Sequence, residues 1–231
     1  MKILNSLNDT EINSLKYEEA KKIDNRTYSE YYISLLRSKH ILLFTFFQHN
    51  DYNSQLIKIY IFFFIFSINY FVSAMFYSDD TLHKIYVDEG SFDFTYQLPQ
   101  MFYSFIISTV LKSLLNILGL YEQNIITFKA DKKYDLKTQK NVLFKIKCKI
   151  LFFFVITDIL LIFFLIYLGC FCAVYKNTQT HLLLNVSSSF CISFISPFFI
   201  YLLPGIFRLS SLKNKANKPL LYKFSKLLQL L

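Results

Sequence analysis

The sequence predicts an all-α integral membrane protein with four transmembrane helices and amphipathic interfacial helices at both ends. The chain is 54% hydrophobic and only 18% charged, whereas soluble domains are close to a quarter charged. Four apolar stretches are each long enough to cross a hydrocarbon core, which takes about 20 residues of helix. The Lys and Arg residues gather beside these stretches, as they do in membrane proteins.

The formal net charge of +9 does not predict a nucleic-acid-binding protein. Such proteins gather Lys and Arg on one face or along one helix, whereas here the basic residues flank the apolar stretches. We therefore expect no nucleic acid among the partners. The expected partners are the lipid bilayer, anionic lipid headgroups at the cytoplasmic face, and either a second copy of the chain or another membrane protein.

The N-terminal region, residues 1–56, is expected to be a cytoplasmic and interfacial helical region. Asn8 and Glu11 resemble a helix-capping pair. Further on, five side chains recur at the spacing of one helix face: Tyr28, Tyr31, Tyr32, Leu35 and Leu36. The apolar string "HILLFTFF" at 40–47 is too short to span. We expect a helix that lies at, or dips into, the membrane interface.

A transmembrane domain is expected at 57–207, with spans at 57–77, 97–120, 150–175 and 182–207. Lys and Arg alternate strongly between the intervening segments, with seven in 1–56, one in 78–96, eight in 121–149, one in 176–181 and six from Arg208 onward. Because cytoplasmic loops are rich in these residues, both termini and the loop 121–149 are expected in the cytoplasm. The segment 78–96, with five acidic residues, is expected as an external loop.

The C-terminal region, residues 208–231, is expected to be a basic amphipathic cytoplasmic tail. The dipeptide Pro204-Gly205 is expected to end or bend the fourth helix. Pro219 then stands at a helix-start position, and the apolar side chains that follow share one helix face: Leu220, Leu221, Phe224, Leu227, Leu228 and Leu231. Two alternatives stay open, because this helix can lie on the membrane surface or pack on the N-terminal helix.

Two ionisable side chains fall inside the expected spans, Lys112 in the second and Asp158 in the third. Each lies eight residues from the cytoplasmic end of its span, which places both about 12 Å deep. An intramembrane charge is costly, and a pair at equal depth removes much of that cost. We expect a structural pair or shared hydrogen-bond network. The alternatives are that Lys112 reaches the headgroups alone beside a protonated Asp158, or that both act in transport.

Small polar residues form a stripe in two of the spans, which is typical of helix packing in lipid. The stripes are Ser104, Ser108, Lys112 and Asn116 in the second span, and Asn185, Ser189, Ser193 and Ser196 in the fourth. A pore formed by an oligomer would carry similar stripes, but packing is the favoured interpretation.

No enzyme is predicted, because the chain has no GxSxG, HExxH or phosphate-binding glycine motif and no second aspartate within a span. The histidines and cysteines lack metal-ligand spacing. We therefore expect no catalytic residue, no metal and no cofactor. Cys148 lies among lysines beside the third span and is a candidate for S-palmitoylation.

Several strings, among them "LHKIYVDEGSFDFTYQLPQMFYS", "CFCAVYKNTQ" and "LPGIFRLSSLK", resemble those of a family of multi-pass membrane proteins from single-celled eukaryotes. The resemblance runs from about residue 17 to the end. It implies a membrane protein of a protist, with no assigned activity to carry over. The expected function is a non-enzymatic membrane anchoring or interaction module. The alternative is a channel or transporter subunit that uses Lys112 and Asp158.

Overall fold

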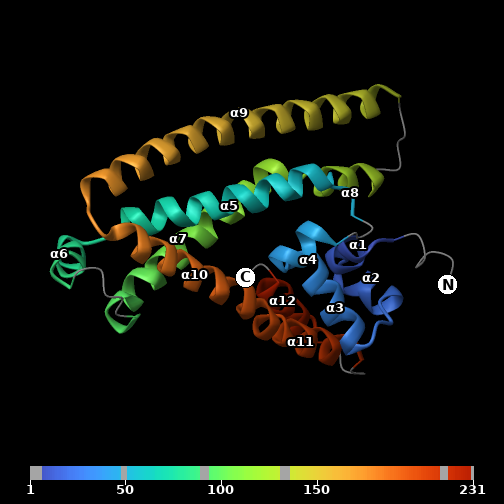
Figure 1. Cartoon of the computed structure of the whole chain (residues 1–231). Helices are drawn as coiled ribbons and strands as arrows, with labels where there is room; N and C mark the ends of the chain where they lie inside the picture. Colours follow the sequence, from blue (N-terminus) through green and yellow to red (C-terminus); the bar gives the residue numbers. More distant parts are fainter. Residues whose placement is uncertain (1–6, 48–50, 89–93, 131–135, 214–217, 230–231) are drawn as a thin grey trace. The chain divides into compact units, whose positions relative to one another are not determined.

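The computed structural model describes residues 7–47, 51–88, 94–130, 136–213 and 218–229, and within these ranges every element is an α-helix. The described residues form twelve helices, whose arrangement Figure 1 shows, and no strand occurs among them. The expected all-α fold is confirmed. The chain divides into two units. We call residues 1–52 and 194–231 the terminal unit, and residues 53–193 the central unit.

Four helical segments are long and apolar enough to cross a membrane, which confirms a multi-pass membrane protein. They are Gln55–Met75, Gln97–Gly119, Lys137–Val174 and Thr178–Lys213. Each contains or largely overlaps one of the four spans expected from the sequence.

The central unit contains α5 (Gln55–Met75), α6 (Asp79–Val87), α7 (Phe94–Gly119), α8 (Glu122–Ala130), α9 (Leu136–Val174) and most of α10 (Thr178–Ile200). Helix α5 packs against both α7 and α9 (Figure 1). The three helices approach closely at Gly119, where an added Cβ would lie 2.9 Å from both Ile61 Cδ1 and Phe153 Cε2. A larger residue there would force the helices apart.

The two expected loops between spans are partly helical. Helix α6 occupies about half of the acidic segment, and its first turn is capped by Ser78, whose hydroxyl accepts from Thr81 N at 3.2 Å. The lysine-rich segment holds α8 and the first turns of α9, since lysine is a good helix former. Lys149 donates through Nζ to Leu120 O at 2.7 Å, just past the C-terminus of α7. A cation there is favourable because the last carbonyls lack helix partners.

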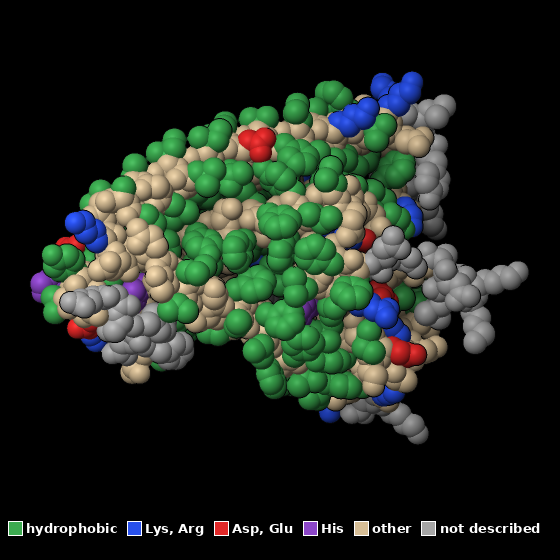
Figure 2. Space-filling view, viewed as in Figure 1, with side chains coloured by type: hydrophobic (Ala, Val, Ile, Leu, Met, Phe, Trp, Pro, Cys, Tyr) green, Lys and Arg blue, Asp and Glu red, His purple; other side chains and the backbone are tan. Residues whose placement is uncertain are grey.

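The central unit exposes apolar side chains over the lengths of its spans. On α9 the exposed set includes Leu151, Phe152, Val155, Ile159, Ile162, Phe163, Leu165 and Ile166. Figure 2 shows hydrophobic side chains over most of the visible face of these helices. A monomeric soluble protein rarely exposes so extended an apolar surface. Contact with lipid tails in a membrane would cover this surface.

The terminal unit contains α1 (Asp9–Ser14), α2 (Tyr17–Ile23), α3 (Tyr28–Lys39), α4 (Ile41–Phe46), the end of α10, α11 (Leu202–Lys213) and α12 (Pro219–Leu228). The capping pair is confirmed, because Asn8 Oδ1 accepts from Glu11 N at 2.7 Å and Glu11 Oε2 accepts from Asn8 N at 2.8 Å. The helix at Tyr28 is also found. Its apolar face is buried against Tyr201 rather than left free to lie on a membrane.

The fourth span is interrupted at Tyr201, between α10 and α11. Proline has no N–H and its ring clashes with the carbonyl four residues earlier, so Pro204 breaks the helix after Ile200. The expected break at Pro204-Gly205 therefore occurs one turn earlier, and both residues lie in the first turn of α11. The expected transmembrane domain ended at 207, whereas the contacts assign residues from Phe194 onward to the terminal unit.

Helix α12 packs on α11 and on the N-terminal helices, which is the second of the two alternatives for the C-terminal region. Tyr222 donates to Leu15 O at 2.8 Å, Lys226 to Ser14 O at 2.8 Å and Ser225 to Pro204 O at 2.8 Å. Figure 1 shows α3 beside α11 and α12. The apolar side chains Leu220, Phe224 and Leu227 remain exposed. Leu231 lies outside the described residues.

Candidate functional site

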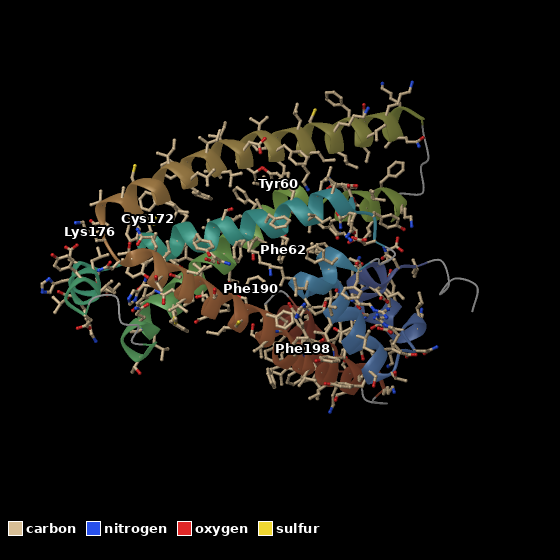
Figure 3. All side chains as sticks on the ribbon, viewed as in Figure 1. Tyr60, Phe62, Cys172, Lys176, Phe190 and Phe198 are labelled. Carbon is tan, nitrogen blue, oxygen red and sulfur yellow. The ribbon has the colours of Figure 1, made fainter. Side chains whose placement is uncertain are left out.

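The carboxylate of Asp158 on α9 accepts a hydrogen bond from the hydroxyl of Tyr60 on α5. Figure 3 shows Tyr60 on the side of α5 that faces α9. Asp158 itself is exposed. Helix α7, which carries Lys112, packs against α9, and the pairing of Lys112 with Asp158 stays a prediction. Sequence reasoning missed Tyr60, because one tyrosine among 17 gives no signal of its own.

Cys148 is exposed and lies in the helical start of α9 rather than in a loop. An exposed thiol beside a span is accessible to acyl transfer. Its palmitoylation stays a prediction.

A larger set of buried polar side chains lies among α5, α7 and α10, and we call it the neutral cluster. It contains Ser73 from α5 and Tyr77 just after it, Gln97, Gln100, Ser104 and Ser108 from α7, and His181, Asn185 and Ser189 from α10. The α7 and α10 members recur every three or four residues, so each set occupies one helix face. Gln97 is 2% exposed and Asn185 1%.

Three hydrogen bonds join the helices within the neutral cluster. Gln97 Nε2 lies 2.7 Å from His181 Nδ1, which connects α7 with α10. Gln100 Nε2 donates to Ser73 O at 2.9 Å, and Asn185 Nδ2 donates to the Tyr77 hydroxyl at 2.8 Å. The cluster therefore holds the ends of three helices together by neutral groups.

Several oxygens of the neutral cluster have no hydrogen-bond partner within the described part of the chain. The carboxamide oxygens Gln97 Oε1, Gln100 Oε1 and Asn185 Oδ1 are buried with no hydrogen-bond partner, as are the hydroxyls of Ser104, Ser108 and Ser189. Buried polar atoms are nearly always partnered by protein or water. Six oxygens of this kind lie on α7 and α10, and such groups ordinarily bind water or a ligand.

The neutral cluster reaches only part of the way along the spans. Eleven residues separate Gln97 from Ser108, and eight separate His181 from Ser189. At 1.5 Å per residue this is about 12–16 Å, or roughly half of a hydrocarbon core. Leu115, seven residues beyond Ser108 on the same face of α7, is buried and apolar. Between Ser108 and Leu115, one turn beyond Ser108 on the same stripe of α7, lies the half-buried Lys112.

The same end of the central unit carries α6, which follows α5 directly. Asp79, Asp80 and Asp88 are exposed there. A hollow of about 450 Å³ lies between α6 and the end of α9, lined by Asp79, Leu82, His83, Tyr86, Val174, Tyr175 and Lys176. In the described part of the chain, no three His, Cys, Asp or Glu side chains gather to hold a metal ion.

The terminal unit contains a second polar site, which we call the charged cluster: Asp24, Arg26 and Arg208. Arg208 on α11 is 1% exposed, and its Nη2 lies 2.8 Å from Asp24 Oδ2 and 3.0 Å from Ile12 O. Arg26 Nε lies 2.8 Å from Asp24 Oδ1. The Arg208 guanidinium also lies over the rings of Tyr31 and Tyr222, at 5.0 and 4.9 Å. These contacts join α11 to the N-terminal helices.

The pKa of Asp24 is shifted by opposing effects. Burial alone would raise it, because a buried carboxylate loses hydration. The hydrogen bonds and positive charges of Arg26 and Arg208 outweigh burial and hold the pKa below its usual value. Asp24 is therefore charged at neutral pH and fully paired.

Sequence reasoning found half of the neutral cluster and missed the charged one. The first two members of each predicted stripe are buried, namely Ser104 and Ser108 on α7 and Asn185 and Ser189 on α10, whereas Lys112, Asn116, Ser193 and Ser196 are only half-buried. Gln97, Gln100 and His181 extend these stripes toward the helix starts, and their spacing would have revealed them. Arg208 was counted among the basic residues of the tail, but it is a core residue. Nothing local predicts this, since its partner Asp24 lies 184 residues away.

Comparison with known proteins adds no assignment. No family model, no curated protein and no solved structure matches the chain.

Proposed function

We propose that the chain is a non-enzymatic membrane module that anchors a folded helical unit and interacts there with lipid or with a partner. The supporting observation is the charged cluster. Arg208 belongs to the apolar segment Thr178–Lys213, and its ion pair with Asp24 fastens the N-terminal helices to that segment. A unit built on the end of a span stays at the membrane. The resemblance to membrane proteins of single-celled eukaryotes agrees with this proposal.

Both termini lie in the cytoplasm in this proposal. Residues 1–52 and 194–231 form one unit, so both ends belong on the same side of the membrane. An even number of spans meets that requirement. The cytoplasm is the proposed side because the lysine-rich segments are there by the positive-inside rule.

The start of α9 is the proposed contact with anionic lipid. Four exposed lysines occupy its first turns: Lys137, Lys140, Lys145 and Lys147. Leu143 and Phe144 are exposed between them. A helix with lysines and exposed apolar side chains next to a span suits the headgroup region. Each basic residue there contributes about 1 kcal/mol to the free energy of binding to an anionic membrane surface. An acidic protein partner would use the same lysines.

An intramembrane partner is proposed at the apolar face of α9. Asp158 is exposed in the middle of that face, and a charged side chain in hydrocarbon costs at least ~2.5 kcal/mol. A second copy of the chain, or another membrane protein, would relieve this cost by covering it. The alternative function is a channel or transporter subunit, in which Lys112 and Asp158 would line a path between such copies.

The test uses the purified protein in nanodiscs and in proteoliposomes. Native mass spectrometry is expected to show retained phosphatidylserine in preference to phosphatidylcholine. A variant with Lys137, Lys140, Lys145 and Lys147 changed to Glu should lose this preference. The matched control changes Lys84 and Lys176, which are expected on the opposite side, and should keep it.

Flux separates the proposed function from its alternative. Proteoliposomes that contain the protein are expected to pass ions and small solutes no faster than empty ones. Flux above that level that disappears with Asp158→Asn would support the channel or transporter function instead.

A further inference from the structure

We propose that the neutral cluster binds a monovalent alkali cation, Na⁺ or K⁺. The proposal goes beyond the anchoring function and does not depend on it. Its basis is the set of six buried, unpartnered oxygens on α7 and α10, which no contact within the described protein satisfies.

The carboxamide groups indicate the kind of ligand, because their nitrogens form hydrogen bonds and their oxygens do not. In Gln97, Gln100 and Asn185 each amide nitrogen is already used in a hydrogen bond, and each carbonyl oxygen is left over. The ligand must therefore bring positive charge or donor hydrogens. Hard cations bind the carbonyl and hydroxyl oxygens of protein, as the backbone carbonyls of K⁺-selective filters do.

The charge of the ligand follows from what the neutral cluster lacks. No Asp or Glu belongs to it, so dipoles alone would compensate a bound charge. Desolvation of a divalent ion without carboxylates is far more costly than that of a monovalent ion. A single positive charge is the better match.

The surroundings of the neutral cluster favour a cation as well. Exposed Asp79, Asp80 and Asp88 of α6 lie at the same end of the central unit, against Lys84 and Lys176. Excess negative charge at an entrance raises the local cation concentration. At the other end, the half-buried Lys112 lies one turn beyond Ser108 on α7, so the cation is expected nearer the Gln97 end.

The experiment measures thermal unfolding of the full chain in nanodiscs, in NaCl, in KCl and in N-methyl-D-glucamine chloride at equal ionic strength. A site occupied only in the folded state raises the unfolding temperature with ligand concentration. We expect a saturable rise in Na⁺ or K⁺, on the order of 5–10 °C at about 100 times the dissociation constant. The organic cation is too large to enter and should give no rise.

Two variants and one control locate the effect. Asn185→Leu removes a carboxamide oxygen, and Ser104→Ala removes one hydroxyl with little risk to folding. Both are expected to weaken the cation-dependent rise. The control is Thr109→Val, since Thr109 is exposed on α7 and its hydroxyl donates to Phe105 O at 2.8 Å. It should keep the full rise.

Two results would overturn the proposal. Equal unfolding temperatures of the wild-type chain in all three salts would mean that water alone fills the cluster. A rise that persists unchanged in both Ser104→Ala and Asn185→Leu would place the cation elsewhere.

Discussion

The charged cluster of the terminal unit and the neutral cluster of the central unit both bury polar side chains between helices, but they differ in how far the hydrogen bonds of those side chains are satisfied. In the charged cluster, Asp24 receives both arginines, and Arg208 also donates to a backbone carbonyl. In the neutral cluster, three carboxamide oxygens and three serine hydroxyls are buried with no hydrogen-bond partner among the described residues. A saturated cluster can only hold helices together, whereas an unsaturated one has capacity for a ligand. The difference separates a structural contact from a candidate site.

The largest expected effect is in the charged cluster. Arg208→Leu leaves the Asp24 carboxylate buried with one partner lost, and we expect a loss of about 3–5 kcal/mol in the free energy of unfolding of the terminal unit. Limited proteolysis of the N-terminal helices measures it. Lys213→Leu, an exposed change on the same helix, is the control. If both variants are cleaved equally, the charged cluster does not hold the terminal unit together.

A single charge inside the central unit should have an intermediate effect. Tyr60→Phe removes the hydrogen bond to Asp158, and a bond to a charged group contributes about 1.5 kcal/mol or more. Thermal unfolding in nanodiscs measures the loss, with exposed Tyr103→Phe as the control. Equal unfolding temperatures for the two variants would show that this bond is unimportant.

The predicted pair of Lys112 and Asp158 is tested in the same assay. Asp158→Leu is expected to lower the yield of folded protein, and adding Lys112→Leu is expected to restore part of it, because the second change removes an unpaired charge. A double variant no better than either single one would disprove the pair.

The neutral cluster should tolerate loss of one hydrogen bond better than the charged cluster tolerates loss of Arg208. Asn185→Leu removes the bond to Tyr77, and a neutral hydrogen bond contributes about 1 kcal/mol. We expect the double variant Asn185→Leu, Tyr77→Phe to be closer to the wild type than Asn185→Leu alone, since the Tyr77 hydroxyl is then not left buried without its Asn185 donor. The comparison is made without alkali cations. A loss as large as that of Arg208→Leu would remove the distinction between the clusters.

Acid should affect the two units differently, and this is the smallest expected effect. The pKa of Asp24 is lower in the folded protein than its usual value of about 3.9. Its contribution to stability is therefore present above that value and is lost as the pH falls through the lowered pKa. Proteolysis of the terminal unit at constant salt should increase below about pH 4. Arg208→Leu should show a weaker pH dependence, and an unchanged one would assign it to other carboxylates.

The sequence predicted what depends on local pattern. Apolar length identified the four spans, and the Asn8 and Glu11 spacing identified the first helix cap. The polar stripes at Ser104 and Asn185 were also visible, because helical periodicity alone places them on one face. These features need no knowledge of distant residues.

What the sequence did not predict depends on partners far along the chain. In the sequence, Arg208 cannot be distinguished from an exposed arginine of a basic tail. Only its contact with Asp24 in the folded chain shows that it is a core residue. The close approach at Gly205 is similar, because a Cβ there would lie 2.8 Å from the Tyr28 ring. The break at Tyr201 was placed one turn late, since the effect of Pro204 falls on the carbonyl of Ile200.

The pairing of Asp24 with Arg208 also has a consequence for biosynthesis. A ribosome adds about 5–20 residues per second, so the 184 residues between the partners take roughly 10–40 s to make. During that interval the first helices are already outside the ribosome, and Tyr201, which packs against Tyr31 and Leu35 in the folded unit, has not yet been made. The terminal unit can complete its fold only after the last span has been synthesised and inserted. A folded terminal unit therefore indicates that the whole chain has been inserted.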